Sequence, residues 1–129
     1  MKLLLDTNVF LKWMNGEKLP KRAMSRVENA SPLFISMVTP WEIAIKSNRS
    51  PKLKLPDSEQ VLKGIDAMGA RLLPITTKHT ALLYSLPAHH NDPFDRMIIA
   101  QALAEDSSVV SSDERFPLYK SAGLQLLWE

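Results

Sequence analysis

Four acidic residues stand at positions from which they could act together on a metal ion. Asp6 directly follows an apolar run that we expect to be a buried strand, and Asp113 follows another such run by one residue. Glu42 and Asp95 each come two residues after a proline, in the patterns Thr-Pro-Trp-Glu and Asp-Pro-Phe-Asp. Because proline is favoured at the first position of a helix, we expect both acids at position N3 of a helix, with Thr39 and Asp92 as the N-caps.

Acids at such places can be interpreted in two ways. Each acid taken singly can be a cap, since a first-turn carboxylate completes a capping box and favours the positive end of the helix dipole. Taken together, the four would converge on one crevice at the carboxyl edge of a parallel sheet, where their mutual repulsion favours a bound cation. Oxygen-only ligands favour Mg²⁺ or Mn²⁺ over zinc, and such ions can activate water and neutralise a phosphodiester. The residue pattern does not divide the roles of ligand and water-orienting group among the four.

Alternating strands and helices must position these acids. Short apolar runs predict five strands, over residues 2–5, 33–37, 71–75, 108–111 and 125–128. Longer amphipathic segments predict helices, over residues 7–14, 20–30, 40–48, 57–68, 78–86 and 93–105. This order implies right-handed βαβ units and a mainly parallel sheet, in which ligands bind beyond the carboxyl ends of the strands.

Size and composition narrow the class of protein. A length of 129 residues predicts a single domain over 1–129, and the complete lack of cysteine excludes disulfides and thiolate metal sites. The first apolar run stops at Asp6, too soon for a signal peptide, and no run approaches the roughly 20 apolar residues of a membrane span. We therefore expect a soluble, cytoplasmic protein with no membrane association.

Basic side chains form two clusters, although the net charge is only +2. One comprises Lys46, Arg49, Lys52 and Lys54, and the other Lys18, Lys21, Arg22 and Arg26. Either cluster can be ordinary solvated surface or a rim that faces phosphates.

Three further residues near the acids are candidates for substrate binding. Lys46 lies one turn after Glu42 and can contact the substrate or pair with that acid. Arg96 follows Asp95 and can clamp a phosphate or pair with a neighbouring acid. His90 can act near the substrate or make a loop contact.

Four stretches of the chain carry a family resemblance. They read LLLDTNVF at 3–10, WEIAIK at 41–46, LPAHHNDPFDRMIIAQ at 86–101 and SSDERF at 111–116. Together they resemble the PIN-domain ribonucleases, in particular the VapC-type toxins, and the third stretch is by far the most specific. Two positions depart mildly from that pattern, because Asn8 stands where close relatives often carry histidine and Ser111 where threonine is usual.

The resemblance implies a PIN-like, three-layer α/β/α fold with a mainly parallel five-stranded sheet. It implies metal-dependent cleavage of RNA, with Mg²⁺ or Mn²⁺ as cofactor. By this resemblance Asp6, Glu42, Asp95 and Asp113 match the family's acidic site, and we expect Asp6, Asp95 and Asp113 to be the metal ligands. A toxin of this type usually forms a homodimer and is held inactive by a cognate antitoxin protein, so RNA, an antitoxin and a second copy are the expected partners.

The sequence disfavours two other functions and leaves two open. A haloacid-dehalogenase-like phosphatase would need a second acid two residues after Asp6, where Asn8 stands. A phospho-receiver domain would need a phosphoacceptor aspartate after the third strand and a lysine after the fifth, and neither Ile75 nor Trp128 is followed by one. An RNA-processing PIN nuclease outside toxin–antitoxin systems and a non-catalytic PIN-fold binding module stay open as alternatives.

Overall fold

A five-stranded sheet runs through the middle of the computed structural model, which describes residues 1–128. The strands are β1 (Leu3–Leu5), β2 (Leu33–Ser36), β3 (Arg71–Leu73), β4 (Ser108–Val110) and β5 (Leu126–Leu127). Their order is β3-β2-β1-β4-β5, and each neighbouring pair is parallel. The three leucines of the central strand β1 are completely buried, as expected for a parallel sheet covered on both faces. The predicted mainly parallel five-stranded sheet is confirmed.

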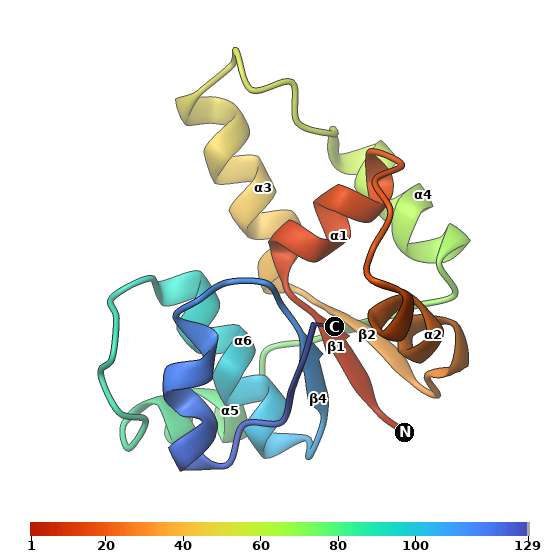
Figure 1. Cartoon of the computed structure of the whole chain (residues 1–129). Coiled ribbons are helices and arrows are strands. Elements are labelled where there is room, and N and C mark those ends of the chain that lie inside the picture. The colour runs from red at the N-terminus through yellow and green to blue at the C-terminus, as the bar shows by residue number, and fades with distance from the viewer. Residues whose placement is uncertain (129) are drawn as a thin grey trace.

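Helices cover both faces of this sheet (Figure 1). Within residues 1–128 they are α1 (Thr7–Met14), α2 (Lys21–Asn29), α3 (Val38–Arg49), α4 (Ser58–Ala67), α5 (Thr77–Leu83), α6 (Pro93–Ala104) and the 3-10 helix η1 (Phe116–Ala122). Phe10 of α1 and Val61 of α4 pack in one core with Leu3 and Leu5, whereas Ile98 of α6 and Phe116 of η1 pack in a second core. The two cores lie on opposite faces, because neighbouring residues of a strand point to opposite sides. The three-layer α/β/α arrangement is thereby confirmed.

The start of α3 differs from the prediction. The helix begins at Val38 with Met37 as N-cap, so Thr39 is not the cap and Glu42 lies in the second turn rather than at N3. One local and one tertiary contact explain the shift, since the Ser36 hydroxyl accepts a hydrogen bond from the Val38 N–H and the buried Thr39 hydroxyl pairs with that of the distant Thr7. Proline at position 40 is tolerated because the first turn of a helix needs no N–H donor there.

Smaller differences lie at the ends of elements. Helix α5 ends at Leu83 rather than at residue 86, and strand β5 is limited to two residues. The 3-10 helix η1 was not predicted, because a single turn or two of 3-10 helix carries no hydrophobic period that a sequence could reveal. None of the helices described for residues 1–128 has the length and apolar character needed to cross a membrane.

The strand order places a topological switch point between β1 and β4. From the central strand β1 the chain extends the sheet first through β2 and β3 on one side, and later through β4 and β5 on the other. In open sheets of this kind, ligands bind in a crevice beyond the carboxyl ends of the strands where the order reverses. Asp6 follows β1 and the segment Ser111–Asp113 follows β4, so both lie at this edge.

Candidate active site

Asp6 joins the end of β1 to the start of α1. It is the N-cap of α1, and its Oδ1 accepts a hydrogen bond of 2.8 Å from the Val9 N–H. Its other oxygen, Oδ2, accepts a short hydrogen bond from the hydroxyl of Ser111, the residue after β4. The side chain is thus fixed between the two strands of the switch point and is almost completely buried.

Asp95 lies in the first turn of α6, near enough to Asp6 for the charge of Asp6 to influence it. The predicted cap is confirmed here: Asp92 is the N-cap, Pro93 follows at N1, and the Asp92 carboxylate accepts from the N–H groups of Phe94 and Asp95 at 2.9 and 3.1 Å. Because Asp92 satisfies the free donors of the helix end, the Asp95 carboxylate is released from capping. It points instead toward Arg115, whose Nη2 lies 3.4 Å from Asp95 Oδ2.

Asp113 is bound by an arginine that the sequence reasoning did not select. Arg115 Nη2 lies 2.8 Å from Asp113 Oδ2, and Arg115 Nε lies 3.1 Å from Asp113 Oδ1. The guanidinium therefore bridges two of the four predicted acids. The Ser111 hydroxyl accepts from the Asp113 N–H while it donates to Asp6, so this hydroxyl shapes the loop even though serine replaces the usual threonine. The sequence showed Arg115 two positions after Asp113 but gave no sign that Asp95 would meet the same guanidinium.

Glu42 lies in the second turn of α3, near enough to Asp6 and Asp95 for its charge to influence both. Its Oε2 forms a salt bridge of 2.6 Å with Lys46, so the predicted substrate-binding lysine is paired with the acid one turn before it. Its Oε1 is buried and has no hydrogen-bond partner among residues 1–128. A buried oxygen without a partner is costly unless something else binds it, which marks Glu42 Oε1 as a position for a cation, a water or a substrate hydroxyl.

The pKa values of the acids show that they share one electrostatic environment. Burial raises the pKa of Asp6 to about 6, and the charges of Asp113 and Glu42 add to the rise against the hydrogen bonds from Ser111 and Val9. Burial likewise raises the pKa of Asp95 to about 7, with added repulsion from Asp92, Glu42, Asp113 and Asp6. Asp113 differs because its hydrogen bonds to Arg115 lower its pKa.

The four predicted acids therefore lie near enough for their charges to influence one another, and their donor chemistry fits a hard divalent cation. All of the candidate ligands are carboxylate oxygens, which Mg²⁺ and Mn²⁺ prefer. In residues 1–128 no three carboxylate or imidazole groups lie close enough to form a ready metal cage. Arg115 and Lys46 hold three of the four acids at present, and Mg²⁺ needs only one or two carboxylates together with waters. The orphaned Glu42 Oε1 supports the same fit.

His90 and Arg96 lie beside the acids but face inward. Arg96 donates to the carbonyl oxygens of Leu86 and Pro87 at 3.3 and 2.7 Å and to the Tyr119 hydroxyl at 3.0 Å. Its guanidinium thus holds the loop before α6 through these hydrogen bonds. His90 contacts the same Tyr119 hydroxyl at 2.8 Å. Burial and the positive charge of Arg115 lower the pKa of His90.

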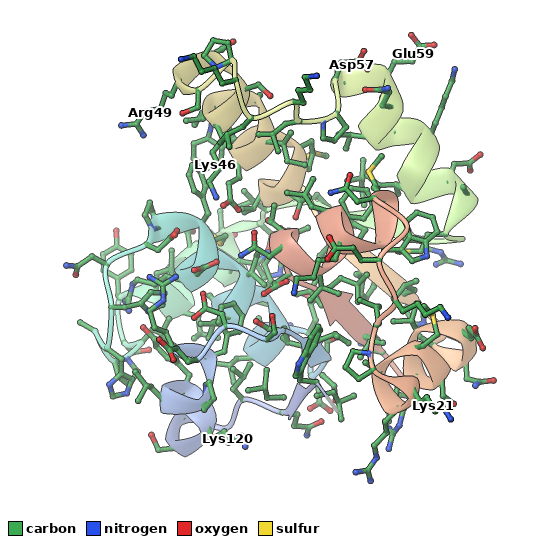
Figure 2. The ribbon with its side chains drawn as sticks, turned by 45° about the horizontal axis from the view of Figure 1, so that its top comes forward. Lys21, Lys46, Arg49, Asp57, Glu59 and Lys120 are labelled. Carbon is green, nitrogen blue, oxygen red and sulfur yellow. The ribbon has the colours of Figure 1, made fainter. Side chains whose placement is uncertain are left out.

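The two predicted basic clusters occupy different parts of the surface. Figure 2 shows Lys46 and Arg49 on α3, well separated from Lys21 on α2 and from Lys120 of η1. The exposed residues Arg49, Lys52 and Lys54 continue from the end of α3 into the loop before α4. Since Glu42 and Lys46 are on the same helix, this cluster extends from the neighbourhood of Glu42 along α3 into the loop that follows it.

The comparison with known families decides the classification. A model of the PIN domain matches residues 3–121. The chain belongs to the PIN-domain family. No curated protein sequence matches it.

Solved structures support the same fold for this PIN domain. VapBC from Salmonella typhimurium, bound to DNA, is 20% identical with a TM-score of 0.72, over 98% of this chain and 97% of that one. VapBC2 from Rickettsia felis, bound to a DNA fragment from its promoter, is 21% identical with a TM-score of 0.68 over 100% of both chains. VapBC-5 from Mycobacterium tuberculosis, a member of the VapBC family of toxin–antitoxin systems, is 18% identical with a TM-score of 0.66, over 99% and 98%. At these identities the similarity shows the PIN-like fold.

Proposed function

We propose that this PIN domain is a Mg²⁺- or Mn²⁺-dependent endoribonuclease. The observation that carries the proposal is the convergence of Asp6, Glu42, Asp95 and Asp113 at the switch point of the sheet, where burial and mutual repulsion raise the pKa of two of them. Arg115 and Lys46 offset part of this repulsion and a bound cation would offset more, and perturbed carboxylates grouped in this way are typical of functional sites.

The roles of the residues follow from their contacts. Asp6, Asp95 and Asp113 would hold the ion, which when bound lowers the pKa of water and neutralises charge on a phosphodiester. Glu42 offers the free Oε1, an acceptor that can orient a hydroxyl group or take its proton in the crevice. The exposed basic residues Arg49, Lys52 and Lys54 would bind phosphates of the RNA beyond the cleavage point.

The same proposal extends to the biological role: a cytoplasmic toxin whose partner is a cognate antitoxin and which acts as a homodimer. Support comes from the similarity to solved VapBC and toxin–antitoxin complexes, among them one from Klebsiella pneumoniae. The exposed side chain of Trp41 at the start of α3, which packs edge-on against Phe94, is compatible with a second copy covering it. The gene beside this one should then encode a small protein that suppresses the toxicity.

A short pulse of expression followed by sequencing of RNA ends tests the role in cells. The wild type should arrest growth and create new RNA ends within minutes, whereas the Asp6→Asn variant should do neither. Growth arrest without new RNA ends would favour a non-catalytic binding module. New ends without arrest, confined to precursor RNAs, would favour an RNA-processing nuclease.

A further inference from the structure

A series of polar contacts leads from Arg96 through Tyr119 and His90 to Asp95. The Tyr119 hydroxyl lies 3.0 Å from Arg96 Nη1 and 2.8 Å from His90 Nδ1. The second nitrogen of His90, Nε2, lies 3.7 Å from Asp95 Oδ2. Tyr119 is completely buried and the His90 side chain is only 7% exposed, so bulk water has little access to these groups. His90 Nε2 is buried without a hydrogen-bond partner among residues 1–128, and it faces the acidic crevice.

The positions of the protons follow from the chemistry of the donors. Arginine can only donate, so the Tyr119 oxygen accepts from Arg96. The buried tyrosine proton needs an acceptor of its own. In the described chain the hydroxyl contacts Arg96 and His90, and only His90 Nδ1 can accept a proton. If His90 Nδ1 accepts, the imidazole proton sits on Nε2, which is the nitrogen that faces the Asp95 carboxylate.

The other end of the series favours the same arrangement. A deprotonated Nε2 would direct its lone pair at the Asp95 carboxylate, which is repulsive, whereas an Nε2–H is attracted to it. Both neighbours of the imidazole therefore select one tautomer. Arg96 in turn is held by the carbonyl oxygens of Leu86 and Pro87, so the series is anchored in the loop before α6.

We propose that His90 is a positioning residue for Asp95, and that Tyr119 and Arg96 fix its Nε2–H tautomer so that it orients the Asp95 carboxylate in the nuclease site. The inference rests on the proposed function, because Asp95 matters only if the acidic crevice binds a cation. The present 3.7 Å separation is longer than a hydrogen bond, and Arg115 holds the same Asp95 oxygen at 3.4 Å. A small rotation of the carboxylate away from Arg115 leaves His90 as its donor.

Groups that orient a metal-binding carboxylate in this way affect the ion more than the substrate. Loss of such a partner typically reduces metal affinity or activity by 10–100-fold. We therefore expect Tyr119→Phe to weaken Mn²⁺ binding and to lower kcat by about tenfold each, with little change in the KM for RNA. If Tyr119 had a purely structural role, Tyr119→Phe would instead alter folding and would not separate Mn²⁺ binding and kcat from the KM for RNA.

The chain offers a matched control in the neighbouring histidine. His89 also packs edge-on against Tyr119, with 4.9 Å between ring centroids, but it is exposed and no contact with an acid is recorded for it in residues 1–128. His89→Leu should therefore leave Mn²⁺ affinity and the state of His90 unchanged. His90→Gln can still present an N–H where Nε2 was and should keep more Mn²⁺ affinity than His90→Leu.

The test combines histidine ¹⁵N NMR with Mn²⁺ titration followed by electron paramagnetic resonance, on the full chain. We expect His90 of the wild type to show a single Nε2–H tautomer. We expect Tyr119→Phe, with an otherwise intact spectrum, to show a mixture of the two His90 tautomers and to bind Mn²⁺ more weakly. An Nδ1–H or mixed tautomer in the wild type overturns the inference. Equal Mn²⁺ affinity in His90→Leu and the wild type also overturns it. This comparison tests the inference even if Tyr119→Phe fails to fold.

Both of these readouts are independent of catalysis. If the wild type cleaves no RNA, the proposed function fails, while the tautomer and Mn²⁺ measurements still support or refute the role of His90. If the wild type cleaves RNA but the tautomer is wrong, only the further inference fails.

Discussion

Neutralising Asp6 should stabilise the metal-free protein at neutral pH. Burial raises the pKa of Asp6 from 3.8 to about 6, so its ionisation in the folded state is unfavourable by about 3 kcal/mol. Asp6→Asn removes that penalty and keeps a side chain of nearly the same shape. Asparagine is as good an N-cap as aspartate, so the hydrogen bond from Val9 can be retained.

The free energy of unfolding depends on pH in a direction set by the raised pKa of Asp6. Below about pH 3.8 Asp6 is protonated in both folded and unfolded chains and imposes no penalty. Between that value and about 6, the unfolded chain ionises first, so the free energy of unfolding falls as pH rises through the folded-state pKa. Above the folded-state pKa the loss of stability is constant. After allowance for relaxation of the site, we expect Asp6→Asn to be more stable than the wild type by about 1–3 kcal/mol at neutral pH.

Urea unfolding in EDTA across this pH range measures the effect. The two proteins should be equally stable near pH 4 and should diverge toward neutral pH. Asp113→Asn is the contrasting control, because Arg115 lowers the pKa of Asp113 and this carboxylate therefore stabilises the fold at neutral pH. Equal or lower stability of Asp6→Asn at neutral pH would refute the reasoning, since it would mean that Asp6 acts only as a cap.

Further predictions concern metal, charge and assembly. In millimolar Mg²⁺ the melting temperature should rise more for the wild type than for Asp6→Asn, because only the wild type keeps all proposed ligands; equal shifts in a thermal melt would contradict this. Arg115→Gln should tighten Mn²⁺ binding by up to about fivefold in a titration, because a half-exposed ion pair is worth at most about 1 kcal/mol and the arginine competes for Asp95 and Asp113; weaker binding would show that Arg115 helps the ion. In EDTA the wild type should lose stability as pH rises to about 7, because the pKa of Asp95 is raised to about 7. Asp95→Asn should remove this part of the loss, which urea unfolding measures. Light scattering should find a dimer that Trp41→Glu disrupts, since Trp41 is 53% exposed; a wild-type monomer at high micromolar concentration would contradict it.

The sequence predicted those parts of the site that depend on local rules. Asp6 and Asp113 could be placed because a residue that follows a buried parallel strand must lie at the carboxyl edge of the sheet. The start of α6 could be placed because Asp92 and Pro93 have the capping chemistry of a helix end, with few competitors nearby.

Other parts depended on contacts between distant residues. The pattern around Thr39 was the same in kind as that around Asp92, but Thr39 is drawn to Thr7, 32 residues away, and α3 begins earlier as a result. His90 pairs with Tyr119, which is 29 residues away and lies in a 3-10 helix that has no recognisable period in the sequence. Local propensity carries no information about either pair.

Arg115 shows a different limit. Its position two residues after Asp113 was visible in the sequence, but an exposed arginine beside an acid is ordinary on protein surfaces. Only the fold brings Asp95 to the same guanidinium from another element, which turns a local ion pair into a bridge across the crevice.

Cleavage of RNA by the purified protein, followed as Mg²⁺ is titrated into protein first stripped with EDTA, tests the central claim most directly. Wild-type cleavage should be undetectable in EDTA, should appear with Mg²⁺ or Mn²⁺, and should remain undetectable in folded Asp6→Asn at every metal concentration. Cleavage that persists in EDTA, or that Asp6→Asn performs as well as the wild type, would contradict a metal-dependent nuclease centred on these four carboxylates.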